Sequence, residues 1–219
     1  MGLVLRASVL ALATYIGMAE QTAPELAQAL QRHYDGIRDF SADFTHTYRG
    51  GVLKKQLTER GHLLVKKPGR MRWEYTAPEE KVFVSDGTKM YSYVPQDKQV
   101  IVSSIPKQDD ATVPMLFLAG KGNLTRDFTP SLVPVPAGLA ADSRALKLVP
   151  RNPQRDYDWL ILAVAPSTLD LRGLVTADAQ GGTSSFSFAN LKENVGLTDK
   201  EFVFKIPRGV DVVTDSPRH

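Results

Sequence analysis

The stretch "VKKPGRMRWEY", Val65 to Tyr75, contains a turn between two segments that alternate like β-strands. After the turn signal Pro68-Gly69, large apolar residues alternate with charged ones; the apolar residues are Met71, Trp73 and Tyr75. A period of two sends alternate side chains to opposite faces of a strand, so these three share one face of a sheet. Such an apolar face can serve only as part of the hydrophobic core, or it can also bind a ligand.

The same alternation precedes this turn. Phe40 and Phe44 lie on one face of a segment that reaches the Gly50-Gly51 turn, and Leu63 and Val65 lie on the apolar side of the next segment. Runs with a period of two, bounded by turn residues, are typical of antiparallel strands. We therefore expect two long strands here, followed by the strand that carries Trp73.

A strong hairpin signal comes later, in "SDGT", where Asp86-Gly87 separates the predicted strands 81–85 and 89–94. Pairing across this turn places Val82 and Val84 on the same face as Tyr91, and Tyr93 continues that face. Further strands are predicted at 99–105, 144–149, 157–164, 168–176 and 184–191, and the tail "EFVFKIPRGVDVV" predicts one or two more.

Two segments have a helical pattern. Thr22-Ala-Pro-Glu25 fits a capping box, and apolar residues at helical spacing follow it, which predicts an amphipathic helix over 23–38. Met115 to Ala119 is apolar on every side and ends in glycines, so we expect a short helix on the covered face of the sheet, with flexible joints. Residues 123–143 are rich in proline and are expected to be irregular.

These elements predict a mainly β protein of about ten to eleven antiparallel strands with a few helices. A sheet of so many strands should curl strongly. Because the alternation is one-sided, one face should be covered and the other exposed to water. The chain contains no internal repeat and no plausible domain boundary, so we expect one domain. We also expect a monomer.

The N-terminal residues 1–19 have the features of a secretory signal peptide. Arg6 is followed by a run without charge, and Gly17 and Ala19 fit the positions before a cleavage at Glu20. A retained anchor is the alternative, although the apolar run is short for a membrane span. We therefore expect an exported single domain over 20–219. The absence of cysteine excludes lipid attachment through that residue.

No constellation of catalytic residues is evident. The four histidines are not spaced like metal ligands, and the adjacent carboxylates Glu79-Glu80 and Asp109-Asp110 would point to opposite sides of an extended chain. The formal charge of +3 and the lack of basic runs argue against nucleic-acid binding. We predict neither an enzyme nor a metal or cofactor site.

The ordered series of motifs resembles the LolA family of periplasmic outer-membrane lipoprotein carriers. The series runs from "LQRHYDGIRDFSADFTHTY" through "GHLLVKKPGRMRWEYTAPEEKVFVSDGTKMYSYVP" and "VPMLFLAG" to "FVFKIPRGVDVV". The resemblance implies an unclosed antiparallel barrel whose concave side, capped by helices, receives lipoprotein acyl chains. It also implies a periplasmic location, an inner-membrane lipoprotein-releasing ABC transporter as donor and an outer-membrane lipoprotein receptor as acceptor.

The resemblance also assigns expected roles to residues. The cavity is expected to be lined by Phe40, Phe44, Leu63, Val65, Met71, Trp73, Tyr75, Val82, Val84, Tyr91, Tyr93, Phe186 and Phe188. The lid is expected to contain Met115, Leu116, Phe117 and Leu118. The family favours arginine before the turn proline as a latch to the lid; Lys67 stands there, so the latch candidates are Lys67, Arg70 and Arg72. The family usually has glutamine where this chain has His46.

A second function is compatible with the same fold: a lipid or peptide sensor or regulatory module of the cell envelope. Such proteins usually carry a further domain or an anchor. Lipoproteins that co-purify with the chain would favour the carrier function.

Overall fold

The computed structural model describes residues 21–50, 56–105, 118, 120, 122–154, 157–177 and 181–214. The predicted signal peptide and the lid residues Met115, Leu116 and Phe117 lie outside the described residues. No helix in the described ranges is long and apolar enough to cross a membrane.

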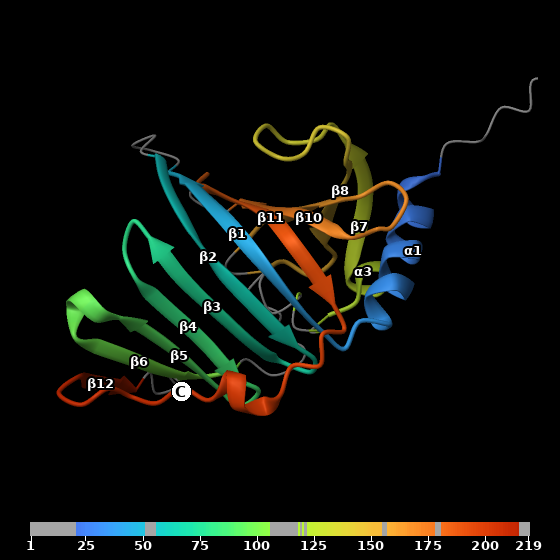
Figure 1. Ribbon diagram of the computed structural model, residues 1–219. Helices are drawn as coiled ribbons and strands as arrows, with labels where there is room; N and C mark the ends of the chain where they lie inside the picture. Colours follow the sequence, from blue (N-terminus) through green and yellow to red (C-terminus); the bar gives the residue numbers. More distant parts are fainter. Residues whose placement is uncertain are drawn as a thin grey trace, which may run out of the picture.

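Twelve strands form one sheet in the order β12-β6-β5-β4-β3-β2-β1-β11-β10-β9-β8-β7 (Figure 1). Neighbouring strands pair antiparallel, except that β12 runs parallel to β6. The strands are β1 (Asp39–Arg49), β2 (Gln56–Lys66), β3 (Arg70–Ala77), β4 (Lys81–Asp86), β5 (Lys89–Val94), β6 (Gln99–Ser104), β7 (Phe128–Val133), β8 (Arg144–Pro150), β9 (Trp159–Val164), β10 (Leu171–Ala177), β11 (Thr183–Glu193) and β12 (Asp211–Thr214).

The main helix, α1 (Ala23–Asp35), begins with the predicted capping box. The side chain of Glu25 accepts a hydrogen bond from the Thr22 backbone N–H at 2.8 Å. The helix ends three residues before the predicted limit, because the Gly36 N–H turns back to the carbonyls of His33 and Tyr34. Shorter helices are α3 (Leu124–Asp127), η1 (Pro95–Asp97) and η2 (Asp199–Phe202).

The prediction of an irregular segment over 123–143 is wrong for its first half. Asn123 accepts hydrogen bonds from Thr125 N and Arg126 N and so caps α3, and β7 follows directly. β7 contains Pro130 and lies at the edge of the sheet. Proline has no N–H to donate, and a strand tolerates it best at an edge.

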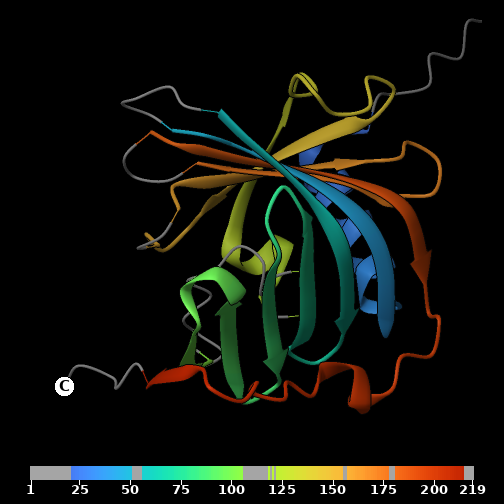
Figure 2. The ribbon, with the colours of Figure 1, turned by 60° about the vertical axis from the view of Figure 1, so that its left-hand side comes forward.

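The sheet is strongly curled, as Figure 2 shows, and its inner face holds the main core. One continuous apolar cluster joins residues from β1, β2, β3, β7, β8, β9, β10 and β11 with α1, α3 and Leu118. α1 lies against β7 and β8 at one end of the sheet (Figure 1). The apolar residues expected at helical spacing are buried in this cluster: Leu26, Leu30 and Tyr34 lie in α1, and Ile37 lies just after its end.

Two other segments cover parts of the outer face. A smaller cluster on β8, β9 and β10 packs against Val133, Val135, Leu139 and Trp159. At the other end of the sheet, η2 packs against β3 and β4. Phe204, which follows η2, contacts the rings of Tyr91 and Tyr93 at centroid distances of 5.5 Å and 5.9 Å. Both faces are therefore partly covered, by different parts of the chain.

Candidate functional site

Four aromatic rings form the centre of the inner wall. Phe44 contacts Trp73 and Tyr75 edge-on, with ring centroids 5.0 Å and 4.8 Å apart, and Trp73 contacts Phe186 at 5.3 Å. Edge-to-face contacts of this kind are favourable beyond the area that they bury. Phe188 extends the wall, with its ring 6.4 Å from Trp73. The four rings come from β1, β3 and β11, which the curled sheet brings together.

Gly61 makes this packing possible. A Cβ at this position of β2 would lie 2.0 Å from the Glu74 carbonyl oxygen and 2.7 Å from Cζ of Phe44. The missing side chain therefore leaves the space that the Phe44 ring occupies, directly opposite Gly61 on the neighbouring strand.

The structure places most of the predicted cavity residues on this inner face. Every member of the following set is in the inner cluster or packs against it: Phe40, Phe44, Leu63, Val65, Met71, Trp73, Tyr75, Phe186 and Phe188. Phe83, which was not predicted, also faces inward, because it pairs with Trp73 across β3 and β4.

Four predicted cavity residues lie on the other face, so their assignment to the inner wall is wrong. Val84 pairs with Arg72, and Val82 pairs with Glu74, which places both valines on the face opposite Trp73. Tyr91 and Tyr93 pair with these valines, as expected from the hairpin, and therefore also face outward. Phe204 covers the two tyrosines on that side.

The inner wall is closed against α1 and Leu118. Leu118 is 1% exposed, and it is the only predicted lid residue in the described part of the chain. A pocket under α1 has a volume of about 20 Å³ and is lined mainly by apolar side chains. This volume is close to that of a single water site and far below that of an acyl chain.

Tyr34 connects α1 with Leu118, and Lys67 connects the turn after β2 with α1. The Tyr34 hydroxyl donates a hydrogen bond to the Leu118 carbonyl, and the Lys67 ammonium group donates one to the Tyr34 carbonyl. The ammonium nitrogen also lies 3.6 Å from the centroid of the Tyr34 ring. The backbone of Gly120 approaches the Lys67 chain so closely that a Cβ there would be 3.0 Å from its Cδ. Burial lowers the pKa of Lys67 to about 8, against the opposing effect of Asp35 and Glu193.

The other two latch candidates lie elsewhere, so their assignment to the lid is wrong. Arg70 is 3.5 Å from the Asp199 carboxylate, and Arg72 pairs with Glu74 at 2.5 Å and donates to the Glu201 carbonyl at 3.4 Å. Both arginines alternate with the apolar residues of β3 and therefore face outward, where they contact η2. The role of Tyr34 was missed, because its helical spacing indicated only a core position.

A polar group ends the aromatic wall. Glu59 is 5% exposed, accepts a hydrogen bond from Lys81 Nζ at 2.5 Å and lies 3.3 Å from His46 Nδ1. The His46 ring stacks on Phe186 with centroids 4.1 Å apart, and its Nδ1 is 3.4 Å from the Tyr75 hydroxyl. Burial lowers the pKa of His46; Glu59 acts in the opposite direction, and Lys81 adds to the lowering. His46 follows Phe44 by two residues, so alternation places it on the inner face, but the sequence carried no sign that Glu59 joins it.

Residues 35–205 match the family model described as "Outer membrane lipoprotein carrier protein LolA". The chain belongs to the LolA family. Among the curated relatives, an outer-membrane lipoprotein carrier protein from Methylobacillus flagellatus is 30% identical over 85% of this chain and 87% of its own length. One from Chromohalobacter salexigens is 29% identical over 86% of this chain and 87% of its own length.

A solved structure shares the fold. It is an uncharacterized conserved protein from Thermus thermophilus, with a TM-score of 0.51, 15% identity and coverage of 86% of this chain and 99% of that one. Membership of the LolA family confirms the predicted resemblance, and the open, curled sheet confirms the predicted fold class. The single parallel pair, β12 with β6, departs from the all-antiparallel prediction.

Proposed function

We propose that this chain carries lipoproteins across the periplasm and holds their acyl chains against the inner wall. The observation that carries the proposal is the continuous apolar cluster, with its aromatic centre, that α1 and Leu118 cover in a chain of the LolA family. Among the described residues, the inner wall is apolar around its aromatic centre, and polar groups lie at its margins: Glu59 with His46 at one end, and His33 with Glu193 under α1. An apolar surface of this kind binds hydrocarbon.

Exposing an acyl chain to water costs so much free energy that a carrier needs an apolar surface of this kind. Burying a chain of sixteen carbons is worth roughly 12 kcal/mol at about 0.8 kcal/mol per CH₂ group. A carrier must provide most of this free energy while the cargo crosses water, and must still release the cargo at its destination. In the closed form the wall already buries its own apolar surface, so opening exposes that surface and reduces the net gain from binding. This compensation makes release feasible.

The closed interior implies that α1, Leu118 or both move when cargo binds. A pocket of about 20 Å³ does not admit an acyl chain. Tyr34 bonds α1 to Leu118 and Lys67 bonds the turn after β2 to α1, so these are the bonds that a movement of α1 would break. We infer that Lys67 serves as the latch, in the position where the family favours arginine.

The setting of this activity follows from the family. We propose a periplasmic location after removal of residues 1–19, with transfer of the cargo from an inner-membrane ABC transporter to an outer-membrane receptor. The chain would then act as a soluble, non-enzymatic monomer. Recovery of lipoproteins with the chain, purified from the periplasm, would support this setting, whereas a chain that never carries them would contradict it.

The two tryptophans offer a direct test of where acyl chains bind. Trp73 lies in the inner wall, whereas Trp159 packs on the outer face with Lys147 Nζ 4.9 Å from its ring centroid. Bromine quenches indole fluorescence only near contact. In the Trp159→Phe variant, brominated fatty acids should therefore quench the emission of Trp73.

The matched control is the Trp73→Phe variant, in which Trp159 is the only reporter. Brominated chains should leave its emission unchanged, while binding is followed separately with a radiolabelled chain. If chains bind and Trp73 is not quenched, the inner wall is a permanent core and the proposed site is wrong.

A further inference from the structure

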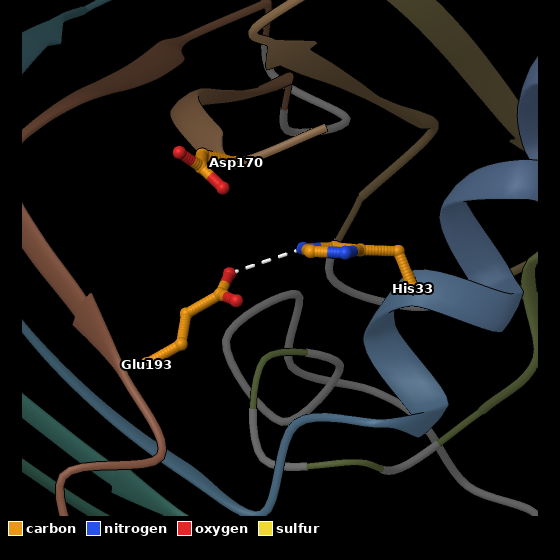
Figure 3. A group of neighbouring side chains, drawn as sticks. All are labelled: His33, Asp170 and Glu193. Carbon is orange, nitrogen blue, oxygen red and sulfur yellow. Dashed lines mark hydrogen bonds and ion pairs between the residues drawn. The ribbon is translucent and has the colours of Figure 1, made fainter. Parts of the chain in front are cut away.

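Three side chains that are distant in sequence meet at the edge of the interior (Figure 3). His33 of α1, Asp170 of the loop before β10 and Glu193 at the end of β11 each offer one atom of a metal-ligating type, and these atoms all lie within 4.8 Å of one another. His33 Nε2 is 3.1 Å from Glu193 Oε1. No spacing rule finds this group, because its members come from three separate elements.

The charges of this group are incompletely balanced. In the described part of the chain, no side chain forms a hydrogen bond or ion pair with the Asp170 carboxylate. Lys67 is a cation close enough to interact with Glu193, but its ammonium group is already bonded to the Tyr34 carbonyl. Two ionised carboxylates that share a site repel each other, and a cation placed between them removes the repulsion.

We propose that His33, Asp170 and Glu193 bind a divalent transition-metal ion, with Zn²⁺ as the best match. Zn²⁺ accepts imidazole nitrogen and carboxylate oxygen at about 2.0–2.2 Å, and three protein ligands leave a fourth position for water. Ca²⁺ and Mg²⁺ prefer oxygen ligands alone, and the imidazole disfavours both. The ligand atoms all lie within 4.8 Å of one another, and a tetrahedral site with bonds of about 2.1 Å would bring them to separations of about 3.4 Å.

The ion would join the covering helix to the sheet. His33 and Glu193, which have side chains 26% and 22% exposed, also line the pocket of about 20 Å³ under α1. A metal bound there would fix α1 to the ends of β10 and β11 and stabilise the closed form. The binding of the ion itself does not depend on the proposed carrier function.

The test measures Zn²⁺ binding to the purified chain after removal of metals with EDTA. Calorimetry should show one Zn²⁺ ion per chain at micromolar concentration, and the midpoint of thermal unfolding should rise with Zn²⁺ concentration. Asp170→Asn should weaken the affinity at least about tenfold, because loss of even an outer-shell partner costs this much. This variant keeps the shape of the side chain and leaves the bond between His33 and Glu193 intact.

His62→Ala is the matched control. His62 Nδ1 also lies beside a carboxylate, 2.5 Å from Asp43 Oδ1, but the second oxygen of that carboxylate accepts from Asn190, and the described residues provide no third ligand. This variant should bind Zn²⁺ as the wild type does, and His33→Ala should not. Equal affinity of Asp170→Asn and wild type, loss of binding in His62→Ala, or no binding in the wild type would each overturn the proposal.

Discussion

At the scale of single residues, Gly61 decides how closely the inner wall packs. Gly61→Ala should destabilise the protein by about 3 kcal/mol, the upper range for overpacking, because the new methyl group meets both the Glu74 carbonyl and the Phe44 ring. Urea unfolding measures the loss. Gly36→Ala is the comparison, because its Cβ would meet only the His33 carbonyl, at 3.3 Å, and should cost well under about 1 kcal/mol.

His46 should make stability depend on pH. Its pKa is lowered in the folded chain, mainly by burial, from the ordinary value of 6.5, so the unfolded chain binds more protons as the pH falls below that value. Stability should therefore be complete above about pH 6.5 and decrease towards pH 5. Glu59, Lys81 and Tyr75 face the ring, and Glu59 limits the shift.

His46→Gln should flatten this dependence, because glutamine does not titrate. Urea midpoints at about pH 7 and pH 5, on either side of the range in which histidine titrates, measure the effect in both proteins. An equal decrease in the variant would show that other groups cause the loss of stability at low pH.

The sequence predicted well which residues of one strand share a face. It predicted less well which residues of the next strand lie on that same face of the sheet. Alternation placed Met71, Trp73 and Tyr75 correctly, but it does not determine how a strand continues across a loop. The connection after Ala77 sets Trp73 opposite Phe83, not Val82 or Val84. The pairing of Glu59 with His46 likewise depends on strand register, which no local pattern reveals.

At the scale of elements, we expect the contacts that Tyr34 and Lys67 make at α1 to govern closure. The pKa of Lys67 is lowered to about 8 in the closed form, from an ordinary value of 10.5. An open form that returns Lys67 to water binds its proton more tightly, so the closed form should gain stability as the pH rises from about 8 towards 10.5. Binding of an apolar dye to the open form should decrease from about pH 7.5 to about pH 9.5.

Lys67→Arg should remove this dependence, because the guanidinium group stays charged over the whole range. It is also a better hydrogen-bond donor to two acceptors at once, so dye binding at about pH 7.5 should be weaker than in the wild type. A pH dependence that persists in Lys67→Arg would exclude Lys67 as its origin.

The sequence predicted most elements because their signals are local: the capping box of α1, the Asp86-Gly87 turn and the alternation of the long strands. The prediction from sequence failed where contacts between distant parts of the chain determine the structure. β7 carries a proline that only its edge position accommodates. β12 pairs parallel to β6, a contact between distant segments that local turns cannot indicate.

At the scale of the whole molecule, the curled sheet separates a face that opens in the proposed carrier mechanism from a face that this mechanism leaves closed. The inner face is covered by α1 and Leu118, which lie on one side of the sheet. The outer face near β4 and β5 is covered by the segment after β11, which Lys66 and Arg70 hold through Asp199 at 2.6 Å and 3.5 Å. Substitutions on the inner face should therefore reduce carrier activity, whereas substitutions on either face should reduce stability.

Two phenylalanines of similar partial burial test this separation. Phe188 extends the inner wall beside Trp73, and Phe204 covers Tyr91 and Tyr93 on the outer face. Phe188→Ala should weaken acyl-chain binding about tenfold, since losing part of one aromatic contact is worth about 1.4 kcal/mol. Phe204→Ala should cost a similar free energy of unfolding and leave acyl-chain affinity unchanged.

Titration with a fluorescent fatty acid gives the affinities, and urea unfolding gives the stabilities of the two variants. Because both substitutions remove the same atoms, a general loss of stability would affect binding in both. A selective loss of affinity in Phe188→Ala assigns the chain to the inner wall. If Phe204→Ala lost the affinity instead, acyl chains would bind under the C-terminal segment, and the closed interior would be only the core that supports that site.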